Sequence, residues 1–519
     1  MAKSSSNATA SYKQFRILIP ICFFLILFSI EHQTTRTLFS IARQGMEIGV
    51  ILEEPETTQK NTTSTAKARS NDTETSQTIE YANTKDELST RTEPPPPPAA
   101  AAPASDVEYE EPLPVSTVAY VITIASCTFR LNKIVLDAAA VLKKSIELSS
   151  YPTHPTARYA AEFFAIVSTA DAQGSCAQKV QSVGFQLQVH ELPVKGPEDI
   201  AIVEGALPPE RMKGDGCCGH NELLKLHAFS FTNHSVVVQL DLDTLLLRPM
   251  EELFDVMIHP PHTLAGKWAR RSLVTSGAIA PTYQPVVPIT EMTFEAFYTK
   301  DYNMVPQGQE DRIGVQGGVM IVRPNITRRD ELIAMAKSGN FFGGRGASKE
   351  KSGWFRSGYG LHIYGAMTIQ GLLAYYYDLV AHENAVELHR CKYNQIVDNP
   401  RRSSIHHVYP RRTSLDPNAT EYDTTCRDGR LDCEDVQCQM WPVVDTRIAH
   451  YTYCKKPWDC TEISEKPMYK GEATCQRLFQ SWFDVRKMVK GKEDAKGSHH
   501  PDIFKGFCDK KNEYIHLQQ

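Results

Sequence analysis

The sequence predicts an α/β fold in which a mostly parallel sheet carries helices on both faces. Its folded part alternates apolar runs of strand length with stretches of helical periodicity, beginning at Val118–Ala125. One of these runs, Val236–Leu240, leads directly into the two carboxylates of Asp241 and Asp243. Because the ligands of open α/β sheets gather beyond the carboxyl ends of the strands, we expect a functional site at this junction.

The predicted elements follow one another in strand–helix order. Val118–Ala125 is almost entirely apolar, as suits a strand covered on both faces, and the apolar residues of Lys133–Leu148 recur at helical spacing. The elements that follow are a strand at Ala161–Val167, a short helix at Gln178–Val183 closed by Gly184, a strand at Phe185–Leu192, a helix capped by Asn221 that ends at Phe231, and the strand Val236–Leu240. No Gly-x-Gly-x-x-Gly or Walker-type loop follows the first strand, so dehydrogenase and P-loop interpretations lose support.

The N-terminal part of the chain predicts entry into the secretory pathway. Lys3, Lys13 and Arg16 precede an uncharged apolar run at 17–30, which we interpret as an uncleaved signal anchor, with a cleaved signal peptide as the alternative. The positive-inside rule then leaves residues 1–16 as a cytosolic tail and sends the rest into the lumen. We therefore expect a single-pass type II protein of the Golgi or endoplasmic reticulum membrane.

Composition divides the lumenal part. Residues 31–114 are rich in Ser, Thr and Pro and poor in large apolar residues, so they predict a disordered stem that cannot form a core. Residues 115–490 form the predicted folded lumenal domain, and residues 491–519 a C-terminal tail. A formal net charge of −5 over 519 residues argues against a nucleic acid partner.

Cysteine usage agrees with an oxidising compartment. Of the 13 cysteines, only Cys22 lies in the apolar run, and the even set that remains predicts disulfides whose pairing the sequence does not reveal. A zinc site is the competing interpretation, but no Cys-x-x-Cys pair supports it. Glycosylation sequons occur at Asn61, Asn71, Asn233, Asn325 and Asn418.

Asp241 and Asp243 predict a metal site. Two carboxylates at the end of a buried strand are costly to bury without a positive partner, and oxygen ligands suit Mg²⁺ or Mn²⁺, ions that usually also bind substrate phosphates. His450 could complete the metal shell, while Lys456 and Lys225 could contact phosphate oxygens. The alternatives are a solvated turn after the strand, a histidine satisfied elsewhere and two solvated lysines.

A pair of glycines interrupts another apolar strand. Gly317 and Gly318 precede the apolar run that begins at Val319. Glycine at such a position marks either a β-bulge or a place where the backbone approaches a ligand closely, and the sequence leaves both interpretations open.

Together these motifs resemble glycosyltransferase family 8, the glycogenin-like enzymes of GT-A fold that use nucleotide-sugar donors. The segments that carry the resemblance are Leu224–Phe254, Gly317–Pro324, Gln370–Leu373, the pair Tyr393-Asn394, and His450–Trp458. They occur in the family's order and cover roughly residues 118 to 458.

The resemblance implies a GT-A fold and a hexosyltransferase that acts with retention of configuration. It implies Mn²⁺, or Mg²⁺, held by Asp241, Asp243 and His450, and a UDP-sugar as the donor. The residues that it assigns to donor binding are Lys225, Asp241, Leu242, Asp243, Gly317, Gly318 and Lys456, and those that it assigns to catalysis are Gln370 and Lys456. The acceptor would be a glycan or a glycoprotein.

The chain departs from the family pattern at several positions. Ile369 replaces the family aspartate before Gln370, and Tyr453 replaces a glycine after the histidine. The Cys-rich stretch 426–475 has no family counterpart, and we hypothesise that it is a disulfide-stapled insertion bracing His450. Two alternatives therefore remain: a catalytically silent lumenal binding or scaffold protein of the same fold, and a GT-A transferase of another family.

Overall fold

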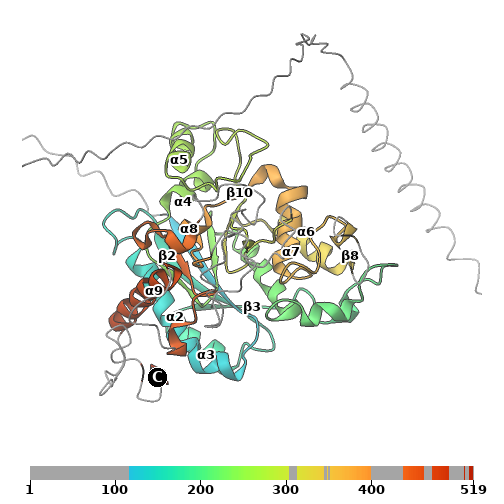
Figure 1. Ribbon diagram of the computed structural model, residues 1–519, viewed down its shortest axis with the longest axis horizontal. Helices are drawn as coiled ribbons and strands as arrows, with labels where there is room; N and C mark the ends of the chain where they lie inside the picture. Colours follow the sequence, from blue (N-terminus) through green and yellow to red (C-terminus); the bar gives the residue numbers. More distant parts are fainter. Residues whose placement is uncertain are drawn as a thin grey trace, which may run out of the picture. The chain divides into compact units, whose positions relative to one another are not determined.

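A seven-stranded sheet occupies the centre of the folded part, with the strands in the order β10-β6-β7-β4-β1-β2-β3 (Figure 1). The computed structural model describes residues 116–302, 312–343, 348, 351–398, 437–460, 470–489, 508 and 513–517. The predicted cytosolic tail, signal anchor and stem lie outside these residues. Within the described ranges, no helix has the length and apolar character needed to span a bilayer.

The sheet is mostly parallel, as predicted. Its strands are β1 (Thr117–Ile124), β2 (Ala160–Ser168), β3 (Gln186–His190), β4 (Val237–Leu240), β6 (Ala296–Tyr298), β7 (Val319–Val322) and β10 (Ala385–Glu387). Of these seven, only β7 runs antiparallel to its neighbours β4 and β6. The remaining adjacent pairs are parallel, which places the ends of β1 and β4 at one edge of the sheet.

Helices cover both faces of the sheet. Alternate side chains of β1 point to opposite faces, and each set packs in a different apolar cluster. Val118 and Tyr120 pack with residues of α2 (Phe129–Leu148), α3 (Ser175–Ser182), α4 (Glu251–Ile258) and α5 (Leu264–Thr275). Ala119 and Val121 pack on the other face with residues of the 3₁₀ helix η3 (Gly219–Ser230), α6 (Ile326–Lys337) and α7 (Ile369–Tyr375). The predicted α/β class with helices on both faces is confirmed.

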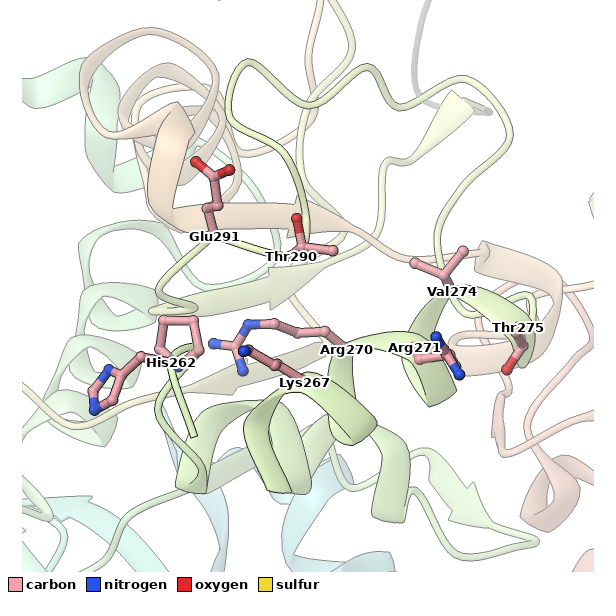
Figure 2. A pocket seen from close by; sticks show the side chains of 9 residues that line it. His262, Lys267, Arg270, Arg271, Val274, Thr275, Thr290 and Glu291 are labelled. Carbon is pink, nitrogen blue, oxygen red and sulfur yellow. The ribbon is translucent and has the colours of Figure 1, made fainter. Parts of the chain in front are cut away.

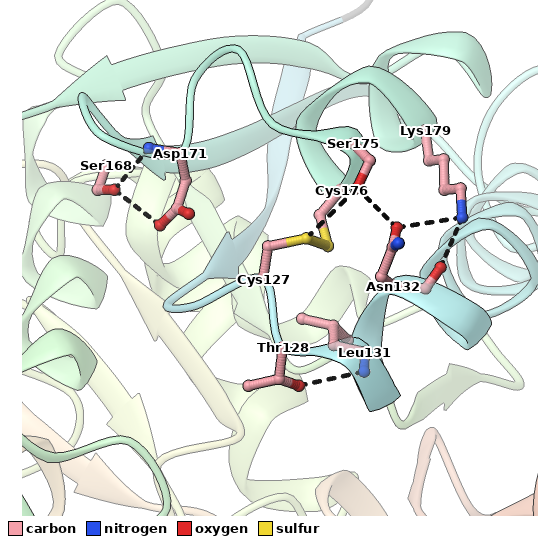
Figure 3. The surroundings of a disulfide bond; sticks show 9 residues. All are labelled: Cys127, Thr128, Leu131, Asn132, Ser168, Asp171, Ser175, Cys176 and Lys179. Carbon is pink, nitrogen blue, oxygen red and sulfur yellow. Dashed lines mark hydrogen bonds between the residues drawn. A yellow bond between two sulfur atoms is a disulfide. The ribbon is translucent and has the colours of Figure 1, made fainter.

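The helix α2 begins four residues before the predicted start. Thr128 is its N-cap, and the Thr128 hydroxyl accepts a hydrogen bond from Leu131 N at 3.2 Å. The Cys127–Cys176 disulfide ties this N-terminus to α3 (Figure 3). Beside it, Lys179 Nζ of α3 donates to Asn132 O of α2 at 2.6 Å, so a covalent and a polar link fasten the two helices together.

The segment before β4 differs from its prediction. Residues 219–230 form a 3₁₀ helix that starts ahead of Asn221, so the prediction of a helix capped by Asn221 is wrong. The reason lies at Gly219, which has a φ of +60° and whose absent Cβ would stand 2.4 Å from Lys213 O. Glycine permits this tight reversal, and the helix begins there.

A third layer lies outside α2. There β5 (Thr244–Leu246) pairs antiparallel with β11 (Ile448–His450), and apolar residues of both join α9 (Lys470–Met488) and the second face of α2 in one cluster. The shorter elements are β8 (Phe341–Phe342), β9 (Gly353–Trp354), α8 (Arg390–Tyr393), the π-helical turn Tyr376–Val380, and 3₁₀ turns at Pro197–Asp199, Pro209–Gly214, His382–Asn384, Cys438–Met440, Val443–Asp445 and Pro457–Asp459.

Disulfides fasten this C-terminal region, as predicted. The pairs are Cys391–Cys438, Cys454–Cys475 and Cys460–Cys508. The Cys454–Cys475 bond links the loop after β11 to α9, consistent with the hypothesis that disulfides brace the His450 segment. Cys426 and Cys433 lie outside the described residues, and Cys217 and Cys218 are free thiols.

Residues near the C-terminus join α2. Asp137, a fully buried residue of α2, accepts hydrogen bonds from the Tyr514 hydroxyl at 2.9 Å, Leu517 N at 3.0 Å and Arg486 Nε at 3.2 Å. Residues 513–517 fall in the range predicted as a C-terminal tail, and they satisfy a buried carboxylate of the domain's first helix.

Candidate metal centre

Two antiparallel strand pairings bring the predicted ligands together. Leu240, the last residue of β4, lies opposite Val319 of β7, so the next residues, Asp241 and Gly318, meet, and Asp241 N donates to Gly318 O at 2.8 Å. In the second pairing, Thr244 of β5 lies opposite His450 of β11. The turn 241–243 therefore carries both carboxylates between the glycine turn and the histidine.

The side chains of Asp241, Asp243 and His450 converge. Their ligand atoms all lie within 4.8 Å of one another, and His450 Nε2 is 3.3 Å from Asp243 Oδ1. His450 is 2% exposed, whereas the carboxylates are partly open to solvent. Two carboxylates and one imidazole suit a divalent cation such as Mn²⁺ or Mg²⁺ that keeps open positions for phosphate oxygens.

Gly318 makes the convergence possible. A Cβ at this position would lie 2.3 Å from His450 Cε1 and 2.9 Å from Asp241 Oδ2. Gly317 and Gly318 form a turn ahead of β7. The backbone at Gly318 passes where any side chain would fill the space between His450 and Asp241, so only glycine fits this position.

A chain of amide hydrogen bonds fixes the orientation of the His450 ring. Gly318 N donates to Gln316 Oε1 at 2.7 Å, so the oxygen of that amide is identified. Asn394 Nδ2 donates to the same oxygen at 3.2 Å and to Thr299 Oγ1 at 2.8 Å, which leaves Asn394 Oδ1 facing His450 Nδ1 at 2.9 Å.

The network fixes a proton on one nitrogen of the His450 ring. Because Asn394 Oδ1 can only accept, His450 Nδ1 carries a proton, an assignment made from the hydrogen bonds. The other nitrogen, Nε2, lies 2.8 Å from the Thr452 hydroxyl and 3.3 Å from Asp243 Oδ1. Such an outer partner on Nδ1 is typical of metal-binding histidines, whose ring it orients.

Each carboxylate is paired with a lysine. Lys225 Nζ lies 2.8 Å from Asp241 Oδ1 and donates to Gly317 O at 3.0 Å. Although burial opposes its charge, Asp241 and Glu222 raise the pKa of Lys225 above its ordinary value, so its ammonium stays protonated.

On the other side, Lys456 Nζ contacts Asp243 Oδ2 and donates to Tyr451 O at 2.5 Å. Burial opposes ionisation of Asp243, but Lys456 and His450 outweigh it and hold the pKa of that carboxyl well below its usual range. Asp243 is therefore a carboxylate at neutral pH, the form that binds a metal ion.

Two other predicted residues, Leu242 and Gln370, lie outside the group of converging ligand atoms. Leu242 packs its side chain against two apolar clusters, so a contact of Leu242 with the donor would involve its backbone. Gln370 is nearly buried, and its Nε2 donates to Tyr364 O at 2.9 Å. A Cβ on Gly317 would lie 3.2 Å from Gln370 Cγ, so Gln370 lies next to the glycine turn of the metal centre.

Ile369 has a packing role. It is fully buried in the cluster that joins α7 to the sheet, and its Cγ2 would lie 3.1 Å from a Cβ on Gly317. An aspartate at this position would place a carboxylate among apolar side chains at a high desolvation cost. The apolar side chain of Ile369, which stands where the family pattern has an aspartate, thus suits its apolar surroundings.

The sequence interpretation assigned no role to Gln316, Asn394, Thr299 or Thr452. Asn394 belongs to the Tyr393-Asn394 pair, which is the one usable signal among these four residues. Each is buried or nearly so, except Thr452, which is half-buried, and each contacts His450 or a residue that contacts it. They orient the ligands rather than supplying them.

A pocket of about 830 Å³ lies beside α5 (Figure 2). Its lining includes Arg270, which is 1% exposed and donates to His259 O, Gly266 O and Met292 O at 3.0, 3.1 and 2.8 Å. Arg270 therefore holds backbone segments together. None of the predicted site residues lines this pocket.

No protein-family model matches the chain, and no curated protein matches it in sequence. Similar solved structures include mouse xyloside xylosyltransferase 1, at 13% identity over 66% of this chain and 99% of that chain, with a TM-score of 0.35. The galactosyltransferase LgtC, in complex with donor and acceptor sugar analogues, has 11% identity over 75% and 99%, with a TM-score of 0.33. The glycosyltransferase GlyE of Streptococcus pneumoniae has 11% identity over 72% and 65%, with a TM-score of 0.31. Similarity at this level leaves the function to be argued from this chain's own residues.

Proposed function

We propose that this protein is a metal-dependent glycosyltransferase. It would move a hexose from a nucleotide-sugar donor, with UDP as the nucleotide, to a glycan or glycoprotein acceptor, with retention of configuration. The observation that carries the proposal is the convergence of Asp241, Asp243 and His450 beyond the end of β4, with Lys225 and Lys456 on either side. We further propose that residues 17–30 anchor the domain in the Golgi or endoplasmic reticulum membrane, with the domain in the lumen.

The charges of the site suit a diphosphate leaving group. When the anomeric C–O bond breaks, negative charge grows on the departing diphosphate. Mn²⁺ or Mg²⁺ held by the two carboxylates and the imidazole would act as a Lewis acid for that charge. Lys456, fixed beside Asp243 by Tyr451 O, supplies a second positive contact that needs no reorganisation.

Gln370 and the glycine turn Gly317-Gly318 would contact and position the donor sugar. An amide cannot act as a base or a good nucleophile, so the role of Gln370 is to position the sugar. Ile369 offers no carboxylate, and its side chain is buried. Retention would then proceed by attack of the acceptor hydroxyl on the same face as the leaving group.

A second candidate function is a catalytically silent binding protein of the same fold. It is favoured by the ion pairs Lys225–Asp241 and Lys456–Asp243, which neutralise both carboxylates without a metal. A transferase of another GT-A family would share the metal centre and differ in its donor. The orientation of His450, with Nδ1 held by Asn394 and Nε2 turned toward Asp243, favours a metal-binding enzyme over a permanent ion-pair network.

Donor hydrolysis tests the proposal. The full chain, purified in detergent, is incubated with a panel of nucleotide sugars with and without Mn²⁺, and the released nucleotide is measured. We expect Mn²⁺-dependent hydrolysis of a UDP-sugar that is lost in Asp243→Asn, a variant of nearly unchanged shape. UDP binding without turnover of any donor would support the silent protein, and turnover that does not require a divalent ion would contradict the metal centre.

A further inference from the structure

Two adjacent thiols lie close to the metal centre. Cys217 and Cys218 are the free cysteines of the described part of the chain, in which eight others form disulfides. Their Sγ atoms are 2.6 Å apart, and Cys217 Sγ lies 2.7 Å from Glu222 Oε1. Cys217 is exposed and Cys218 half-buried, so a soluble thiol reagent has access to the pair.

Two chemistries are open to this pair: with Glu222 the thiols could hold a metal ion, or they could bond to each other. The metal set offers three ligands, one fewer than the four of a structural zinc site. The two sulfur atoms are already in contact, so a bond between them needs little movement. We propose that Cys217 and Cys218 form a reversible vicinal disulfide beside the donor site.

The conformation of the loop around the pair favours this bond. Gly216 and Gly219 flank the two cysteines with φ of +70° and +60°, values that other residues seldom adopt. A Cβ on Gly219 would also collide with Lys213 O, so the reversal of the chain is tight. The two glycines hold Cys217 and Cys218 in one fixed turn.

The bond forms by thiol–disulfide exchange with a low-molecular-weight disulfide such as oxidised glutathione. The Cys218 thiolate, whose pKa is lowered by the hydrogen bond with Cys217, attacks the oxidant and expels one glutathione thiolate. The Cys217 sulfur then attacks Cys218 Sγ as its proton leaves and expels the second glutathione thiolate, so two protein thiols are oxidised while one disulfide is reduced to two thiols, which receive the two protons.

The bond is expected to be labile. Adjacent Cα atoms are about 3.8 Å apart across a trans peptide, below the range of roughly 4.4–6.8 Å that is usual for disulfides. The other disulfides of the described residues have Cα–Cα distances between 4.7 and 6.0 Å. A strained, exposed disulfide is reduced more readily than unstrained ones, so this pair should open first.

Oxidation of the two thiols should change the ion pairs of the candidate metal centre. In the reduced form the Cys217 thiol donates to Glu222, a buried residue of η3. When that donor is lost, we expect the Glu222 carboxylate to attract the ammonium of Lys225, which is three residues further along η3. Lys225 would then pair less closely with Asp241. We expect oxidation to weaken binding of UDP with Mn²⁺ several-fold, a consequence that rests on the proposed function.

The state of the thiols is measured first. The full chain is equilibrated in glutathione buffers of graded potential, alkylated under denaturing conditions and analysed by peptide mass spectrometry. We expect the 217–218 pair to be oxidised in the most oxidising buffer and to open at potentials at which Cys127–Cys176 and Cys454–Cys475 persist. Complete alkylation of both thiols in every buffer would overturn the proposal, as would stoichiometric Zn²⁺ binding that is lost in Cys217→Ser.

The link to the donor site is measured separately. Calorimetry of UDP with Mn²⁺ compares the oxidised and reduced protein with the double variant Cys217→Ser/Cys218→Ser. Several-fold weaker binding in the oxidised protein, absent in the variant, supports the link, and equal affinities in both states refute it. If the disulfide forms as expected but UDP binds in neither state, the proposed function fails while the disulfide stands.

Discussion

Gly318 lies so close to the ring of His450 that a Cβ on the glycine would stand 2.3 Å from His450 Cε1. The same Cβ would lie 2.9 Å from Asp241 Oδ2, so one missing side chain keeps two candidate metal ligands within reach of each other. The antiparallel pairing of β4 with β7 delivers the glycine to this position. The candidate metal centre thus depends on the register of the sheet as well as on the residues that carry its ligand atoms.

Gly318→Ala should separate the ligands without unfolding the protein. We expect affinity for Mn²⁺, measured by calorimetry, to fall on the order of tenfold or more, because ligands displaced from their geometry bind weakly. Gly214→Ala is the control, since a Cβ there meets no atom within 4 Å. Unchanged Mn²⁺ affinity in Gly318→Ala would show that the ion binds elsewhere.

Lys456→Ala should impair sugar transfer far more than Lys455→Ala. Lys456 contacts Asp243, whereas Lys455 is exposed. Loss of a positioned charge beside the leaving group typically costs on the order of 10²-fold in rate, whereas an exposed lysine changed to alanine alters stability by about 0.5 kcal/mol or less. Steady-state kinetics with the best donor measures both variants. Equal rates in the two would remove the assignment of Lys456 to the diphosphate.

Asn394→Ala should loosen the His450 ring. The variant loses the acceptor for His450 Nδ1, and removal of such an outer partner typically costs about 10- to 100-fold in metal affinity. Thr299→Val is the matched control, because it removes only an acceptor for Asn394 Nδ2 and leaves Gln316 to hold the amide. Mn²⁺ calorimetry as a function of pH checks both. A larger loss in Thr299→Val than in Asn394→Ala would contradict the orientation described for the histidine.

Asp215→Asn should change how stability depends on pH. Burial raises the pKa of Asp215 from 3.8 to about 6, against a hydrogen bond from Met367 N at 2.7 Å. The folded state therefore favours the protonated form, and the stability present below about pH 3.8 is lost as the pH rises through 6. Asparagine cannot ionise but can still accept from Met367 N.

The comparison is made by thermal unfolding at pH 4 and pH 7.5. We expect the melting temperature of Asp215→Asn, relative to that of the natural protein, to rise between the two pH values. Because both proteins share every other titrating group, the difference isolates this carboxyl. A constant difference would mean that folding does not raise the pKa of Asp215.

The sequence predicts β1, β2, β3, β4 and β7, because buried strands are nearly uninterrupted apolar runs. It does not predict β6 and β10, which are only three residues long each. It also locates Asp241 and Asp243 at the end of β4. It fails at residues 219–230, where the left-handed glycine at 219 starts a 3₁₀ helix that apolar periodicity does not reveal.

The network around His450 shows why the rest could not be predicted. Asn394 and Gln316 lie 78 residues apart in the chain, and Asn394 and His450 lie 56 apart. Their contacts depend on the mutual placement of separate strands and loops, which no local pattern encodes. The roles of Lys225 and Lys456 as partners of particular carboxylates have the same origin.

Asp137 has a consequence for the order in which the chain can fold. Its partner Tyr514 lies 377 residues further along, so a ribosome adding about 5–20 residues per second needs roughly 20–75 s to supply it. During that time the Asp137 carboxylate of the first helix lacks the hydrogen bond from the Tyr514 hydroxyl. The contact between the first helix and the C-terminal segment can therefore form only after residue 514 has been synthesised, late in the life of the nascent chain.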